Sequence, residues 1–128
     1  MLRFSFTLCC FALWALPLGA DPLMGLWLTP PDAKGQIAHV QVRRCDGGFC
    51  GKIVEVRAAT GGSIQHKNLG KDLFWAMRPQ GGGRYVGQGW LPKNNLRFNG
   101  EAQVVGDRLT FRGCAAGICK NQTWQRLR

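Results

Sequence analysis

Beyond its first twenty residues, the chain alternates apolar and polar positions with a period of two rather than with the period of a helix. The clearest alternation lies on both sides of two cysteine pairs, in QIAHVQVRR (36–44), GKIVEVR (51–57), DRLTFRG (107–113) and KNQTWQRL (120–127). A segment that alternates in this way and is rich in branched and aromatic residues presents one apolar face as a β-strand. The pattern therefore predicts four strands.

Three further segments continue the pattern: MGLWLT (24–29), RYVGQGWL (84–91) and NLRFNGEAQVV (95–105), the last two joined by a turn at PKN (92–94). Between Ala58 and Met77 the chain is Gly-rich and polar, which predicts a long loop, with LFWAM (73–77) as a strand or a plug beneath it. Gly87 and Gly89 alternate within one strand, which indicates a sharp bend or a close approach there. The expected fold is all-β: a single small antiparallel up-and-down β-barrel of about eight strands, closed so that no edge stays open.

The first twenty residues, MLRFSFTLCCFALWALPLGA, follow a different pattern. One charge, Arg3, precedes an apolar run that ends at Leu18, and small residues follow up to Ala20. This arrangement is typical of a cleaved export signal, and the run is too short for a membrane span. We expect cleavage after Ala20 and removal of Cys9 and Cys10 with the signal.

The mature chain would then be residues 21–128, and this length is typical of a single domain. We expect this domain to be a periplasmic monomer without a transmembrane segment. Removing Arg3 from 17 basic residues leaves 16 against seven acidic ones, a net charge of +9. Such a charge favours anionic partners. The basic residues are dispersed, however, so a merely solvated positive surface is the simpler alternative.

Four cysteines remain after cleavage: Cys45, Cys50, Cys114 and Cys119. An even number in an exported chain predicts disulfides. A four-thiolate zinc site is the alternative, although such sites usually space their pairs more tightly. A redox pair would be expected as Cys-x-x-Cys at the start of a helix, whereas the residues that flank these cysteines are typical of strands.

The strands that flank the cysteines predict the pairing. Loops of four residues, DGGF and AAGI, would close two hairpins, with Cys45 opposite Cys50 and Cys114 opposite Cys119. The matching registers place Val42 opposite Ile53, Phe111 opposite Gln122 and Leu109 opposite Trp124. Because side chains alternate, the sulfurs would face outward and the apolar side chains inward.

Candidate catalytic groups are few. The mature chain has one serine, Ser63, the histidines His39 and His66, and the glutamates Glu55 and Glu101. They form no recognisable hydrolase motif, and metal and nucleotide motifs are lacking in the sequence. We therefore expect a protein without catalytic activity, cofactor or metal, with His39 as a surface residue.

Small basic barrels with aromatic side chains can bind single-stranded nucleic acid by stacking. Export argues against that partner, and we expect none. The exposure of Phe74, Trp75, Tyr85 and Trp90 discriminates the alternatives, because a nucleic-acid surface would expose them beside Arg and Lys. We expect these side chains to be buried or to line a cavity.

The motifs GLWLT, VRRCDGGFCGKIV, GQGW and GCAAGICKNQTWQR, in this order, resemble domain-of-unknown-function family 2147, small secreted bacterial proteins. The middle differs, because SIQHKNLG stands where the family often has an Asn-Pro-Asp-Pro loop. The resemblance implies a lipocalin-like or fatty-acid-binding-like barrel in the periplasm, with no established activity. Lipocalins also carry Gly-x-Trp on the first strand and an arginine near the last, which implies that Gly25, Trp27 and Arg126 close one end.

A closed barrel of eight strands has room for one small ligand. The first functional hypothesis is therefore an exported protein that holds a small apolar or amphipathic molecule, contacted by Tyr85, Trp75, Trp90 and Phe98. The interior candidates are Trp27, Trp90, Phe98, Leu109, Phe111 and Trp124. Basic residues at the hairpin tips, namely Arg43, Lys52, Arg112 and Lys120, would favour an anionic head group. The alternative is a filled barrel whose basic exterior binds an anionic envelope polymer or another protein.

Overall fold

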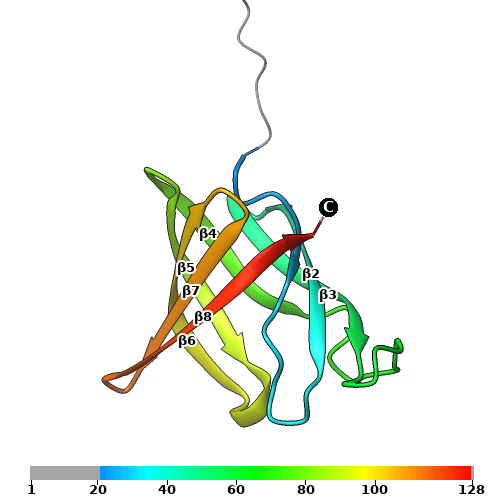
Figure 1. The fold of residues 1–128 in the computed structure, drawn as a ribbon. Coiled ribbons are helices and arrows are strands. Elements are labelled where there is room, and N and C mark those ends of the chain that lie inside the picture. The colour runs from blue at the N-terminus through cyan, green and yellow to red at the C-terminus, as the bar shows by residue number, and fades with distance from the viewer. Residues whose placement is uncertain (1–20, 128) are drawn as a thin grey trace, which may run out of the picture.

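The alternating segments form eight antiparallel strands, each paired with the next along the chain, and β1 pairs with β8 to close a barrel (Figure 1). The computed structural model describes residues 21–127, so the expected export signal lies outside the described residues. The elements are β1 (Gly25–Leu28), β2 (Ile37–Cys45), β3 (Gly48–Arg57), β4 (Asp72–Gly81), β5 (Arg84–Leu91), a 3-10 turn η1 (Pro92–Asn94), β6 (Leu96–Val105), β7 (Arg108–Ala115) and β8 (Ile118–Leu127). The predicted up-and-down barrel of about eight strands is confirmed.

The segment 73–77 is part of strand β4 and not a plug. Opposite Gly87 of β5, strand β4 carries two residues, Ala76 and Met77, and this is a β-bulge. Ala76 takes a φ of 52°, a left-handed conformation that is uncommon for a residue with a side chain. The extra residue shifts the alternation of β4, so that Phe74 and Met77 are both fully buried.

The first cysteine hairpin, β2–β3, has a different register from the predicted one. Its turn holds only two residues, Asp46 and Gly47, with φ of 41° and 76°. Two positive φ values in sequence are typical of the type I′ turn that matches the twist of a hairpin. Cys45 therefore lies opposite Gly48, and Cys50 lies opposite Arg43.

The disulfide of this hairpin is nevertheless present and runs diagonally between the strands. The Cα atoms of Cys45 and Cys50 are 5.8 Å apart. The predicted pairing of Val42 with Ile53 is wrong, because the shorter turn places Val40 opposite Ile53. Cys50 is also only 2% exposed, so this sulfur is not on an open surface.

The second cysteine hairpin, β7–β8, has the predicted register. Cys114 lies opposite Cys119, with 4.1 Å between their Cα atoms and a disulfide between them. Leu109 lies opposite Trp124 and Phe111 opposite Gln122, as predicted. The strands extend further than expected, so the four-residue loop is a two-residue turn at Ala116 and Gly117.

Aromatic rings fill the barrel. Three rings pack against one another: the centroid distances are 5.5 Å for Phe74–Phe111, 5.7 Å for Phe111–Trp124 and 6.1 Å for Phe74–Trp124. Phe98 packs edge-on against Phe111. We call Phe74, Phe98, Phe111 and Trp124 the inner ring cluster.

Glycines on the neighbouring strands make room for these rings. A Cβ atom added at Gly51 would lie 2.4 Å from the ring of Phe74. One added at Gly89 or Gly113 would lie 2.5 or 2.4 Å from the ring of Phe98. The close approach expected at Gly89 is therefore made by an aromatic side chain of the barrel itself.

One end of the barrel is closed by Arg126 of β8. Its guanidinium carbon lies 4.3 Å from the centre of the Trp27 ring, and its Nη1 donates a hydrogen bond to the carbonyl of Met24. The Trp27 indole donates to the carbonyl of Leu23, and both of these side chains are fully buried. Gly25 lies beside them, where a Cβ atom would be 3.3 Å from Arg126 Nη1. The structure thus brings together the three residues that the lipocalin resemblance implied.

Candidate functional site

The four side chains predicted to contact an interior ligand divide between the two faces of the barrel wall. Tyr85 is 2% exposed and faces inward, and Phe98 is half-buried within the inner ring cluster. Trp75 and Trp90 face outward, which corrects the prediction that Trp90 lies in the interior. Strand alternation is the reason, because their neighbours Phe74 and Gly89 face inward.

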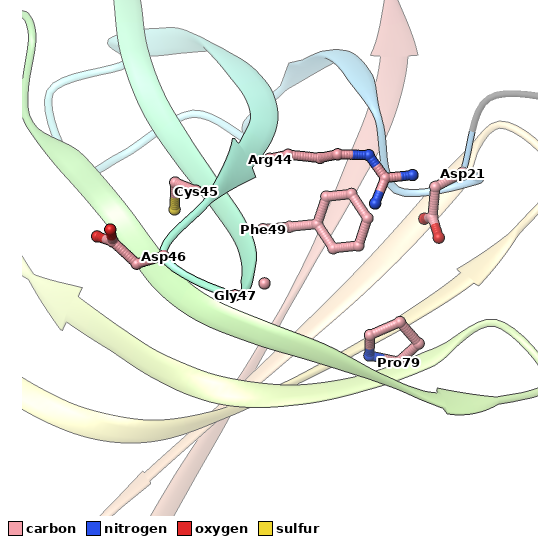
Figure 2. Close-up of a pocket in the computed structure, with 8 residues that line it drawn as sticks. Asp21, Arg44, Cys45, Asp46, Gly47, Phe49 and Pro79 are labelled. Atoms are coloured by element: carbon pink, nitrogen blue, oxygen red, sulfur yellow. The ribbon is translucent and has the colours of Figure 1, made fainter.

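A first hollow, of about 500 Å³, lies at the rim of the barrel beside the β2–β3 turn (Figure 2). It is lined by Asp21, Arg44, Cys45, Asp46, Gly47, Gly48, Phe49 and Pro79. Figure 2 shows the side chain of Arg44 extending beside the ring of Phe49, and its guanidinium carbon lies 5.1 Å from the ring centre. Phe49 in turn meets Tyr85 edge to face, at 5.9 Å.

One charged group of this rim hollow, the carboxylate of Asp21, is occupied by the protein itself. The Tyr85 hydroxyl donates a hydrogen bond to the carboxylate of Asp21, which also accepts from the backbone N–H of Leu23 at 3.0 Å. Burial, followed by this hydrogen bond, raises the pKa of Tyr85. The arrangement fastens the start of the described chain across the barrel end, and it is better explained as a cap than as a ligand site.

A second hollow, of about 470 Å³, lies on the outer face of β4, β5 and β6, over the bulge of β4. It is lined by Ala76, Arg78, Val86, Gly87, Gln88, Asn99, Gly100 and Glu101. The amide of Gln88 donates to the Asn99 side-chain oxygen at 3.1 Å. Glu101 forms an ion pair with Arg84 at 3.0 Å.

The two outward tryptophans lie next to one end of this second hollow. Trp75 pairs across the strands with Gln88, and Trp90 pairs with Arg97. The guanidinium carbon of Arg97 lies 5.5 Å from the Trp75 ring centre, and the ammonium of Lys71 lies 5.5 Å from that of Trp90. We call Lys71, Trp75, Gln88, Trp90, Arg97 and Asn99 the outer aromatic face.

The criterion for a nucleic-acid surface is therefore met only in part. Phe74 and Tyr85 are buried, whereas Trp75 and Trp90 are partly exposed and each lies against a basic side chain. The sequence contained a signal for one of them. In RYVGQGWL, Trp90 shares its parity with the polar Gln88 and not with the inward Tyr85.

The structure brings together a serine, a glutamate and a histidine that no sequence motif groups. The Ser63 hydroxyl donates to Oε1 of Glu55, His39 Nδ1 lies 3.0 Å from Glu55 Oε2, and Arg57 pairs with the same carboxylate at 3.1 Å. These contacts lower the pKa of Glu55, and the hydrogen bond from Ser63 is the largest cause. His66 lies apart in the loop, where its Nδ1 accepts a hydrogen bond from the backbone of Asn68.

The order within this group does not fit nucleophilic catalysis. A histidine activates a serine only when the imidazole itself takes the hydroxyl proton, with the acid behind it. Here Glu55 lies in the middle and occupies both the Ser63 hydroxyl and His39. The group instead ties the loop after β3 to the barrel wall, together with the bridge between Arg57 and Ser63.

Two further observations concern residues 21–127. No three side chains among their histidines, cysteines and acids gather into a group that could hold a metal ion. No helix in this part of the chain is long and apolar enough to cross a membrane.

Eight antiparallel strands that close in chain order, with an arginine over the first-strand tryptophan at one end, define a lipocalin-like barrel. A solved structure with this fold is protein HP1028 from the human pathogen Helicobacter pylori, described as belonging to the lipocalin family. The TM-score is 0.62 over 83% of each chain, with 15% sequence identity, and this likeness concerns the fold alone.

Residues 25–126 match the model of a family described as an uncharacterized protein conserved in bacteria, DUF2147. The match covers most of the chain, which therefore belongs to this family. No curated protein sequence matches the chain.

Proposed function

We propose that this protein is an exported, non-catalytic binding protein that binds an anionic polymer of the cell envelope through the outside of its barrel. The observation that carries the proposal is the filled interior. The rings of the inner ring cluster pack against one another inside the barrel, and the neighbouring Gly51, Gly89 and Gly113 have no room even for a methyl group. Both hollows described above lie outside this cluster.

The distribution of charge supports an anionic partner. Four carboxylates are already paired with arginines: Arg43–Asp72, Arg57–Glu55, Arg84–Glu101 and Arg126–Asp107. Among the described residues, no carboxylate pairs with Lys71, Arg78 or Arg97 on the outer face of β4 to β6. Unpaired cations on one face attract polyanions, and this attraction weakens as salt screens it.

The two disulfides support export, because such bonds persist in oxidising compartments and are rare in the cytosol. They are local staples, each closing a six-residue segment at a hairpin tip.

A small apolar ligand in the interior is the second candidate. The lipocalin-like fold favours it, as does the half-buried Phe98 in the inner ring cluster. Such a ligand would have to displace the ring of Phe98, because the remaining rings of the cluster pack against one another.

The test measures both candidates on the same protein, residues 21–128. We expect the protein to bind fluorescently labelled polyacrylate or polygalacturonate at low ionic strength and to release it as NaCl is raised to about 0.5 M, since the Debye length then falls to a few ångströms. A dye that fluoresces in apolar cavities is expected not to bind. Binding of the dye, together with a small molecule retained in native mass spectrometry, would replace the exterior site by the interior one. Failure of both polyanions to bind would reject the proposal.

A further inference from the structure

We propose that the outer aromatic face is a binding site for an acidic polysaccharide, with Trp75 and Trp90 as stacking surfaces and Arg97 as the residue that binds the acidic group. This inference rests on the proposed function, which requires only that the exterior bind some anionic polymer. It adds the place on the barrel and the chemical class of the polymer.

Trp90 of this face is held in place by a hydrogen bond. Trp90 Nε1 donates a hydrogen bond of 2.9 Å to the side chain of Asn95, in the turn between β5 and β6. Asn95 itself has a φ of 47°, a left-handed conformation, and its N–H bonds to the carbonyl of Pro92. The indole is thus fixed before any ligand arrives, so that binding costs little side-chain entropy.

Arg97 is arranged to bind an anion. Its guanidinium lies over the Trp75 ring, and no described carboxylate pairs with it. A guanidinium that rests on an aromatic ring keeps its N–H groups available at its edge, where a carboxylate can be bound by two parallel hydrogen bonds. Lys71 adds a second unpaired cation over Trp90.

Two amide side chains, Gln88 and Asn99, line the hollow at the end nearest the tryptophans. Gln88 donates to Asn99, which leaves the Gln88 oxygen and the Asn99 amino group without a partner among the described residues. A sugar ring has an apolar face of C–H groups and a rim of hydroxyls, so it needs an aromatic surface with donors and acceptors beside it. The adjacent hollow of about 470 Å³ offers space for such a ring.

The charge of the face selects an acidic sugar over a neutral one. Lys71, Arg78 and Arg97 lack a carboxylate partner, whereas the acid of the hollow, Glu101, is neutralised by Arg84. A polynucleotide would also supply anions and flat rings, but it is stacked by successive aromatics along a groove, and two of the four candidate aromatics are buried. The predicted export also removes the chain from nucleic acid.

The experiment compares four labelled probes on the 21–128 protein: oligogalacturonate, its methyl ester, polyacrylate of equal charge and an oligothymidylate. The methyl ester keeps the rings without the charge, and polyacrylate keeps the charge without the rings. We expect oligogalacturonate to bind about tenfold more tightly than the ester or polyacrylate. This ratio of dissociation constants corresponds to a difference of about 1.4 kcal/mol in the free energy of binding. Its addition is also expected to change the tryptophan fluorescence.

Three variants locate the site. Trp90→Ala and Arg97→Gln should each weaken oligogalacturonate binding about tenfold. Asn95→Gly, which releases the Trp90 indole and accepts the positive φ of this position, should weaken it by a smaller factor. Arg108→Gln removes the same charge outside this face and should change the affinity less than about twofold. Urea unfolding of each variant controls for loss of structure.

The outcomes separate this inference from the proposed function. If oligogalacturonate and polyacrylate bind equally and the variants bind like the unaltered protein, the site is rejected while exterior binding of a polyanion stands. If neither polyanion binds, both proposals fail. Tighter binding of the oligothymidylate than of oligogalacturonate would overturn the polysaccharide in favour of single-stranded nucleic acid.

Discussion

The inner ring cluster and the outer aromatic face lie on opposite sides of the same barrel wall and differ in what their rings contact. Inside, the ring of Phe111 stacks with those of Phe74 and Trp124 at 5.5 and 5.7 Å. Outside, Trp75 and Trp90 each lie against a cation at 5.5 Å. Phe74 and Trp75 are adjacent in the chain. Because side chains alternate along a strand, Phe74 packs in the core and Trp75 lies on the outer surface.

The two arginine–tryptophan pairs show the same difference. Arg126 lies 4.3 Å from the fully buried Trp27 ring and donates further hydrogen bonds to backbone carbonyls. Arg97 lies 5.5 Å from the partly exposed Trp75 ring and has no other side-chain partner among the described residues. A buried pair of this kind supports the fold, whereas an exposed pair leaves its cation available to a ligand.

The largest expected effect separates Phe74 from Trp75. Phe74→Ala should lower the free energy of unfolding by about 3–5 kcal/mol, because it removes a fully buried ring and leaves a cavity. Trp75→Ala should lower the free energy of unfolding by about 1 kcal/mol, because it removes an exposed cation–π contact and a ring that is only partly buried. Urea unfolding followed by circular dichroism measures both. Equal losses would show that Trp75 belongs to the core and that the comparison of the two faces is wrong.

The next largest effect is the difference in stability between an Arg126 variant and an Arg97 variant. Arg126→Ala should lower the free energy of unfolding by about 3 kcal/mol, because it uncovers Trp27 and leaves carbonyls of the closed end without their donor. Arg97→Ala should change it by about 0.5 kcal/mol or less, as is usual for a surface substitution. Thermal unfolding of the two variants at the same ionic strength gives the comparison. A loss at Arg97 as large as that at Arg126 would contradict it.

The filled interior can be tested by adding a single carbon atom. Gly51→Ala should lower the free energy of unfolding by about 2 kcal/mol, since the new Cβ would lie 2.4 Å from the Phe74 ring and 2.9 Å from Val40. Gly62→Ala is the control, because nothing lies within 4 Å of a Cβ added there, and its effect should stay within about 0.5 kcal/mol. If Gly51→Ala were as stable as the unaltered protein in urea, the barrel would have unused space and the interior-ligand hypothesis would regain support.

The smallest effect concerns the polar cluster outside the barrel. Ser63→Ala should raise the pKa of Glu55 toward the ordinary value of about 4.3, because the hydrogen bond from Ser63 is the largest cause of its lowering. A lowered pKa stabilises the folded protein above the unfolded-state pKa, and this contribution is lost as the pH falls through the folded-state pKa. Carboxyl titration by NMR measures the change. An unaltered pKa in the variant would show that Arg57 and His39 set its value.

Much of the architecture could be predicted because it depends on local order in the sequence. Alternation at 84–91 and 107–113 is a property of neighbouring residues, and it correctly indicated strands and most of the inward side chains. The same alternation also indicates that Trp90 points outward, because it has the parity of the polar Gln88. The direction of Trp75 and Met77 was less accessible, because the bulge at Ala76 changes the phase of β4.

The two cysteine hairpins mark the boundary of such prediction. Both have the spacing Cys-x4-Cys, but in one the turn is at Asp46–Gly47 and in the other at Ala116–Gly117. The turn lies directly after Cys45 in the first hairpin, and it lies midway between the cysteines in the second. Cysteine spacing therefore determined which sulfurs bond, whereas the residues with positive φ determined the strand register.

By itself, the sequence determined most of the strands and the two local disulfides, since each of these follows from residues close together in the chain, whereas closure of the barrel depends on the pairing of β1 with β8. Only the tertiary structure decided that the barrel is filled and that two tryptophans meet unpaired cations outside it. Both facts depend on residues that are distant in the chain: Phe74 of β4 packs against Phe111 of β7 and Trp124 of β8, and Arg97 of β6 reaches Trp75 on β4. Volume and charge are matched between strands only when the barrel closes, so no pattern within one strand contains them.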